Sequence, residues 1–141
     1  MQEFISHNLA DTEKFAKSLL ANFGDKHILA LSGSLGAGKT TFVKFLATAL
    51  GVKENITSPT FVLLKVYEIE KQRYQKFVHV DCYRLDGNED LEDIGLQDYV
   101  SDDCNLVLIE WADKISNLPL DKVLHIKIEI LGETERKFII S

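Results

Sequence analysis

The chain has 141 residues, 45% of them hydrophobic and 27% charged, a composition typical of one globular domain that folds in water over residues 1–141. Its net charge of −6 disfavours tight binding to nucleic acid by the chain alone, because such binding depends on neutralising phosphates. No apolar run approaches the ~20 residues of a membrane span. The first five residues also lack the basic and apolar regions of a signal peptide. We therefore expect a cytoplasmic protein without membrane contacts.

Two cysteines, Cys82 and Cys104, each stand beside an apolar segment and are expected to be buried free thiols. The sequence has no C-x-x-C pair and no Cys/His cluster, which argues against a zinc site. A chain of this length buries enough apolar surface to fold without disulfides or a structural metal.

The first half of the chain predicts two strands and two helices in alternation. The apolar spacing and the capping residues predict a strand (3–6), a helix (N-capped by Asp11, running to about Phe23 and ended by Gly24), a strand (27–31) and a helix (39–50, stopped by Gly51).

The second half predicts mainly strands. After a turn-rich connector we expect an antiparallel hairpin (61–69 and 73–80, with its tip at 70–72), a short helix (capped by Asn88, ending near Gly95), a buried strand of the parallel type (105–109) and two final strands (122–131 and 136–140). The predicted fold class is α/β: a single domain with a mixed parallel and antiparallel sheet flanked by a few helices.

The glycine-rich stretch after strand 27–31 fits the P-loop pattern G-x-x-x-x-G-K-[ST] through Gly33, Gly38, Lys39 and Thr40. Glycines let backbone N–H groups converge on phosphate oxygens, and the N-terminus of the next helix adds its positive dipole end. Lys39 can reach the β- and γ-phosphates, and the Thr40 hydroxyl can bind Mg²⁺. The expected nucleotide-binding residues are Gly33, Ser34, Leu35, Gly36, Ala37, Gly38, Lys39, Thr40 and Thr41. With this motif, the predicted α/β domain is like a P-loop NTPase.

A P-loop needs an acidic residue to position Mg²⁺ or water, usually at the end of a neighbouring apolar strand. Asp81 follows Phe77-Val-His-Val80, and Glu110 follows Leu106-Val-Leu-Ile109. Both acids have the required pattern, so both remain candidates for metal binding and for catalysis.

The nucleotide is expected to be ATP, because the sequence lacks the D-x-x-G and N-K-x-D motifs of GTPases. A kinase is disfavoured, since the only arginines are Arg73, Arg84 and Arg136, and kinases use several to stabilise transferring phosphates.

Three further features have two interpretations each. A threonine of Thr57-Ser-Pro-Thr60 either senses the γ-phosphate or belongs to an ordinary turn. His79 is a packing or hydrogen-bonding residue more readily than a catalyst. Trp111 is either part of the core or a cover or partner-contact residue beside the metal-site acid.

These motifs together resemble the TsaE (YjeE) family. The resemblance rests on Gly33-Ser-Leu-Gly-Ala-Gly-Lys-Thr-Thr41, Ser58-Pro-Thr-Phe61, His79-Val-Asp-Cys-Tyr-Arg-Leu85 and Leu108-Ile-Glu-Trp111, in the family's order and spacing. It extends over nearly the whole chain, and this combination of motifs is highly specific.

The resemblance implies a bacterial cytosolic ATPase required for threonylcarbamoyladenosine modification of tRNA. It implies two partner proteins, TsaD and TsaB, that raise a weak ATPase, and contact with tRNA only through these partners. It places phosphate and Mg²⁺ binding on Lys39 and Thr40, and metal binding or catalysis on Asp81 and Glu110. Less securely, it places base contacts on Asp11, Thr12 and Arg136. The residues implied in switching or partner contact are Thr57, Thr60, His79, Tyr83, Arg84 and Trp111.

Two other functions compete with this one. A small-molecule kinase would transfer the γ-phosphate to an acceptor other than water, and a non-hydrolytic interaction module would respond to nucleotide binding alone.

Overall fold

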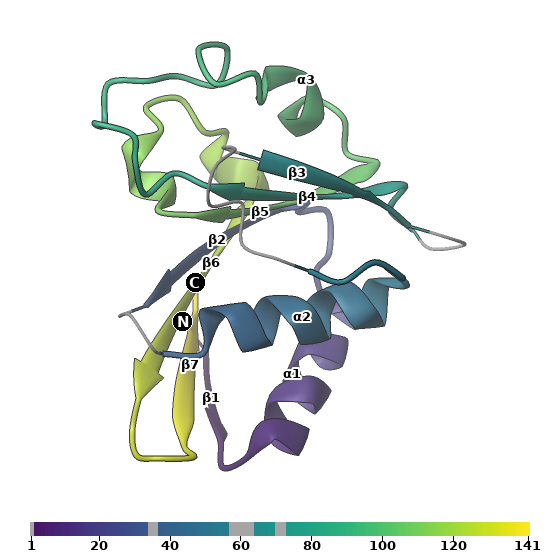
Figure 1. Ribbon diagram of the computed structural model, residues 1–141, viewed down its shortest axis with the longest axis vertical. Coiled ribbons are helices and arrows are strands. Elements are labelled where there is room, and N and C mark those ends of the chain that lie inside the picture. Colours follow the sequence, from purple (N-terminus) through teal and green to yellow (C-terminus); the bar gives the residue numbers. More distant parts are fainter. Residues whose placement is uncertain (1, 34–36, 57–63, 70–72) are drawn as a thin grey trace.

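The computed structural model describes residues 2–33, 37–56, 64–69 and 73–141, and its main feature is one seven-stranded sheet with strand order β1-β7-β6-β2-β5-β4-β3 (Figure 1). The elements are β1 (Gln2–Ser6), α1 (Leu9–Ala21), β2 (Ile28–Gly33), α2 (Lys39–Leu50), β3 (Leu64–Glu68), β4 (Lys76–Asp81), α3 (Gln97–Val100), β5 (Asn105–Glu110), η1 (Ala112–Lys114), η2 (Leu120–Lys122), β6 (Val123–Ile130) and β7 (Arg136–Ile140).

The centre of the sheet is parallel and its edges are antiparallel. β2 pairs in parallel with β5 and with β6, and β5 pairs in parallel with β4. β3 is antiparallel to β4, as the predicted hairpin requires, and β7 and β1 extend the other edge antiparallel to β6. The predicted α/β class with a mixed sheet is therefore confirmed. In such sheets ligands bind beyond the carboxyl ends of the parallel strands.

The two faces of the sheet are covered differently (Figure 1). Helices α1 and α2 pack on one face, over a core in which the rings of Phe15, Phe42 and Phe138 lie in mutual contact. Much of the opposite face is covered by α3 and by irregular chain between β4 and β6. Leu91 and Leu96 of the irregular chain and Val100 of α3 are buried in one cluster with apolar residues of β4 and β5. Strand β5 is buried along its whole length because it lies between both layers, which explains its uninterrupted apolar run.

The predicted N-cap of the first helix was wrong. The helix begins three residues earlier than expected, with Asn8 as its N-cap, and the Asn8 side chain accepts a hydrogen bond from the backbone N–H of Asp11 at 2.9 Å. The carboxylate of Asp11 in turn accepts from the backbone N–H of His7 at 3.0 Å. Asp11 thus stands in the first turn, where an acid also stabilises the helix end. The helix ends at Ala21 with Asn22 as its C-cap, before the predicted stop at Gly24.

The short helix predicted after Asn88 is absent. Residues 91–95 form turns, and the helix of this region is α3, further along the chain. Asp90 and Asp93 accept each other's backbone N–H groups at 3.0 and 2.9 Å. Such side-chain bonds to the local backbone compete with helix formation. Leu91 is buried as expected, whereas Ile94 is only half-buried.

The other boundaries lie close to those expected, and helix 39–50 with its stop at Gly51 matches residue for residue. Cys82 is a buried free thiol as predicted, but Cys104 is only partly buried, because it lies in the exposed turn before β5. The hairpin tip 70–72 and residues 61–63 of the predicted strand lie outside the described residues. In the described part of the chain, no helix has the length and apolar character needed to cross a bilayer.

Candidate active site

The P-loop leads from the carboxyl end of β2 into α2. Two of its positions require glycine, because a Cβ would clash or be strained there. A Cβ on Gly33 would lie 2.9 Å from the backbone oxygen of Ile128 on neighbouring β6. Gly38 is the N-cap of α2 in the left-handed conformation with φ of 94°, which is strained for residues with a Cβ. The predicted strand–loop–helix setting of the motif is therefore present. Ser34, Leu35 and Gly36 lie outside the described residues.

Lys39, Thr40 and Thr41 form the first turn of α2, where the backbone N–H groups have no partner within the helix. Thr40 is exposed, whereas Lys39 and Thr41 are partly buried. The Nζ of Lys39 lies 5.3 Å from the ring centroid of Trp111, a cation–π contact. The P-loop lysine therefore contacts the residue that directly follows Glu110.

The two candidate acids lie side by side at the carboxyl edge of the sheet. Asp81 of β4 is paired in register with Glu110 of β5, and Glu110 is paired with Leu31 of β2, two residues before Gly33. The P-loop, Glu110 and Asp81 thus end three consecutive parallel strands. The structure brings together the residues that the sequence could only propose one by one.

The environments of the two acids differ. Glu110 is buried, with 9% of the residue exposed, and its Oε2 lies 2.9 Å from Nε2 of His79. Asp81 is partly exposed, and one of its carboxylate oxygens accepts a hydrogen bond from the backbone N–H of Tyr83 at 3.0 Å.

The donor set at this edge fits a magnesium ion. Mg²⁺ prefers oxygen ligands and takes few of them from the protein, usually one or two carboxylates together with phosphate oxygens and water. Thr40 offers a hydroxyl, and Asp81 and Glu110 offer carboxylates at the ends of adjacent strands.

Two cavities lie against the P-loop. One, of about 560 Å³, borders Gly38 and Thr41 and extends towards α1 and the β6–β7 turn; it is lined by Asn8, Leu9, Ala10, Thr12, Ala37, Gly38, Thr41, Glu133, Thr134, Arg136 and Phe138. The other, of about 510 Å³, borders Gly33, Lys39 and Trp111, next to η1 and β6. Both are large enough for a bound small molecule.

Two of the three predicted base-contact residues lie at the first cavity. Thr12 and Arg136 line the first cavity, whereas Asp11 is not among its lining residues. The Nε of Arg136 donates to the backbone oxygen of Ala37 at 3.0 Å, and Nη1 donates to the oxygen of Gly132 at 2.8 Å. Arg136 therefore fastens the β6–β7 turn to the P-loop and shapes the cavity wall.

The remaining motif residues surround the carboxyl edge unequally. Tyr83 and Arg84 are exposed, and the ring of Tyr83 lies 5.4 Å from that of Trp111 between centroids. The His79 side chain is buried against Glu110, and its implied part in switching or partner contact stays a prediction. Thr57 and Thr60 lie outside the described residues.

Lys114 lies beside the site, although it belongs to none of the predicted motifs. Its Nζ donates to the backbone oxygens of Tyr83 at 2.6 Å and Leu85 at 2.9 Å, and it lies 5.7 Å from the ring centroid of Trp111. It fastens the loop after β4 to η1 beside the site. These contacts depend on backbone carbonyls distant in the sequence, so no motif signals them.

Asn8 also lies outside the predicted motifs, although asparagine is a favoured helix N-cap. Its side chain fixes the start of α1, and the residue lines the cavity beside Gly38.

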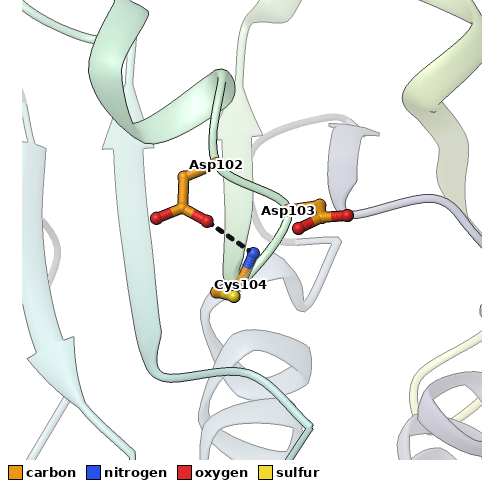
Figure 2. Close-up of side chains that lie close together, drawn as sticks. All are labelled: Asp102, Asp103 and Cys104. Carbon is orange, nitrogen blue, oxygen red and sulfur yellow. Dashed lines mark hydrogen bonds between the residues drawn. The ribbon is translucent and has the colours of Figure 1, made fainter.

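A second group of potential metal ligands lies at the amino end of β5, opposite the end that carries Glu110. Asp102, Asp103 and Cys104 cluster in the turn before this strand, where Asp102 accepts from the backbone N–H of Cys104 at 3.0 Å (Figure 2). The Asp102 carboxylate raises the pKa of the Cys104 thiol, which disfavours the thiolate that metals bind. Asp102 and Asp103 are exposed, and the cluster lies at the end of β5 opposite the edge that carries Glu110.

The family described as "Threonylcarbamoyl adenosine biosynthesis protein TsaE" matches residues 6–138. The chain is 34% identical over 137 residues to the tRNA threonylcarbamoyladenosine biosynthesis protein TsaE of Treponema pallidum, covering 97% of this chain and 98% of that protein. For the protein of the same name from Aquifex aeolicus the identity is 36% over 139 residues, covering 97% and 93%.

A solved structure shows the same similarity. The crystal structure of Bacillus subtilis YdiB matches with a TM-score of 0.69 at 30% sequence identity, covering 97% of this chain and 82% of that one. Agreement of the family match, the curated relatives and this structure over nearly the whole chain shows that the chain belongs to the TsaE family of threonylcarbamoyladenosine biosynthesis proteins.

Proposed function

We propose that the chain is the ATP-binding, weakly ATP-hydrolysing subunit of the machinery that makes threonylcarbamoyladenosine in tRNA, and that it acts with the partner proteins TsaD and TsaB. The curated relatives are named for the biosynthesis of this modified nucleoside. The observation that carries the proposed chemistry is the alignment of the P-loop, Glu110 and Asp81 at the carboxyl ends of β2, β5 and β4.

Each residue has a distinct part in this proposal. The N–H groups at the start of α2 and the Lys39 ammonium bind the β- and γ-phosphates, and the Thr40 hydroxyl and the two acids hold Mg²⁺ or orient water. When bound, Mg²⁺ neutralises charge on the phosphates. The cavity lined by Thr12 and Arg136 receives the nucleoside, since it opens beside Gly38 and Thr41.

Lys39→Ala and Glu110→Ala separate binding from hydrolysis. We expect Lys39→Ala to abolish ATP binding measured by calorimetry, because it removes the charge that meets the phosphates. Glu110→Ala should still bind ATP but lose hydrolysis and the ability to support tRNA modification with TsaD and TsaB. Lys44→Ala is a matched control, because Lys44 is exposed on the same helix and should leave both activities unchanged.

Three outcomes would contradict the proposal. Wild-type modification by Glu110→Ala would favour the interaction module that only binds nucleotide. Transfer of labelled γ-phosphate to an acceptor other than water would favour a kinase. Failure of the wild-type chain to bind ATP would remove the basis of the whole assignment.

A further inference from the structure

His79 occupies a buried position in β4, and the fold alone does not account for its chemistry. The residue is 3% exposed, and its ring stacks on that of Phe77 with centroids 6.3 Å apart. Its Nε2 lies 2.9 Å from Oε2 of Glu110, and the Glu110 side chain is only 12% exposed. A valine or leucine would fill this strand position without burying any polar atom.

The hydrogen bond fixes which ring nitrogen carries hydrogen. An ionised carboxylate can only accept, so Nε2 of His79 is the donor to Glu110. The other nitrogen, Nδ1, is buried and has no hydrogen-bond partner among the described residues. Burying a polar atom without a partner is unfavourable. The chain therefore retains an unfavourably buried ring nitrogen at this position. Among the described residues, the hydrogen bond that the His79 side chain makes is to Glu110.

We propose that His79 is a positioning residue that fixes the Glu110 carboxylate for the metal ion and phosphates at the P-loop. The bond holds Oε2, while Oε1 accepts no hydrogen bond from the described residues and is left to bind the metal or water. Without the bond, the flexible glutamate side chain would sample several rotamers. Partners of metal-binding groups commonly contribute about 10- to 100-fold to metal affinity or activity. This inference rests on the proposed function, and it assigns His79 a role within the molecule.

His79→Gln and His79→Asn form a matched test. Both keep a polar amide, but only the longer glutamine side chain can place a donor near the position of Nε2. The affinity for a non-hydrolysable ATP analogue is measured by calorimetry with Mg²⁺ and with EDTA. The affinity with Mg²⁺ divided by the affinity in EDTA gives the contribution of Mg²⁺ to binding. We expect His79→Asn to lower this ratio about tenfold or more. His79→Gln should restore most of it, and the affinity in EDTA should stay near that of the wild type in both variants.

His27→Asn is the control for exchanging a buried histidine, since His27 is also 3% exposed but precedes β2, at the edge opposite the P-loop. It should leave the ratio unchanged. Equal ratios in His79→Asn, His79→Gln and the wild type would overturn the inference, as would an equal loss in both variants. If His79→Asn fails to fold, His79→Phe, which keeps a ring against Phe77, replaces it.

A double-mutant cycle tests whether His79 acts through Glu110. In a Glu110→Gln background, His79→Asn should cause no further loss of Mg²⁺ dependence. A loss as large as in the wild-type background would overturn the inference and leave the proposed function intact. A wild-type chain that binds the analogue equally with Mg²⁺ and with EDTA would contradict the proposed function as well, so the two failures are distinguishable.

Discussion

Trp111 has a left-handed backbone conformation, with φ of 61°, and in the described part of the chain no other non-glycine residue has a positive φ of this kind. This conformation costs roughly 1–2 kcal/mol for a residue with a Cβ. It occurs directly after Glu110 and places the ring beside both Lys39 and Lys114. Strain of this kind is typical of functional sites. We interpret it as the consequence of placing the ring against the P-loop lysine.

Comparison of Trp111→Gly with Trp111→Ala measures this strain. Both substitutions remove the ring. Glycine adopts the left-handed conformation without a steric penalty, whereas alanine keeps the penalty because it has a Cβ. We expect the free energy of unfolding of the glycine variant to exceed that of the alanine variant by about 1 kcal/mol. Urea unfolding followed by circular dichroism measures the difference, because both variants lack the single tryptophan of the chain. An alanine variant at least as stable as the glycine variant would show that the backbone is unstrained.

At the scale of an element, the start of helix α1 is fixed by side-chain hydrogen bonds to the backbone. The Asn8 side chain satisfies the N–H of Asp11 inside the helix, whereas Asp11 accepts from His7 outside it. We expect Asn8→Ala to lower the free energy of unfolding by about 1 kcal/mol. Asp11→Ala should cost less, and thermal unfolding of both variants tests the order. A larger loss for Asp11→Ala would restore Asp11 as the dominant cap.

The sequence predicted those elements whose local pattern and tertiary role agree. Helix α2 and strand β5 have clear periodicity and are packed accordingly, so their bounds were nearly right. The segment 88–96 was misassigned because the side chains of Asp90 and Asp93 accept hydrogen bonds from the backbone of a turn instead of capping a helix.

The candidate site follows the same division. Lys39, Asp81 and Glu110 were found because each ends or follows a strand in a recognisable motif. The hydrogen bond between His79 and Glu110 joins side chains 31 residues apart in the sequence. The contact of Lys39 with Trp111 joins residues of different elements. Such contacts depend on strand order and register, which the motifs alone do not specify. The pairing of β4 with β5 brings His79 to Glu110, and the pairing of β2 with β5 brings the P-loop to the side of Trp111.

Charge is distributed unevenly over the whole molecule. Residues 86–103, which cover part of the face opposite α1 and α2, include no lysine or arginine. Their acidic residues are Asp86, Glu89, Asp90, Glu92, Asp93, Asp98, Asp102 and Asp103. The exposed residues Tyr83 and Arg84 precede this layer in the chain. A surface with such an excess of acidic residues repels phosphates.

We therefore expect the purified chain to bind tRNA no more tightly than non-specifically, with a Kd of roughly 10⁻⁴ to 10⁻⁶ M at physiological salt. The physical reason is the excess of 22 acidic over 16 basic residues together with this acidic layer. Fluorescence anisotropy of labelled tRNA, repeated at several salt concentrations, measures both affinity and its salt dependence. A variant with the acids of residues 86–93 changed to their amides is the matched comparison, and it should bind more tightly if charge is the cause. A submicromolar Kd for the unchanged chain would mean that it contacts tRNA itself, and its acidic layer would then need a different explanation from exclusion of phosphates.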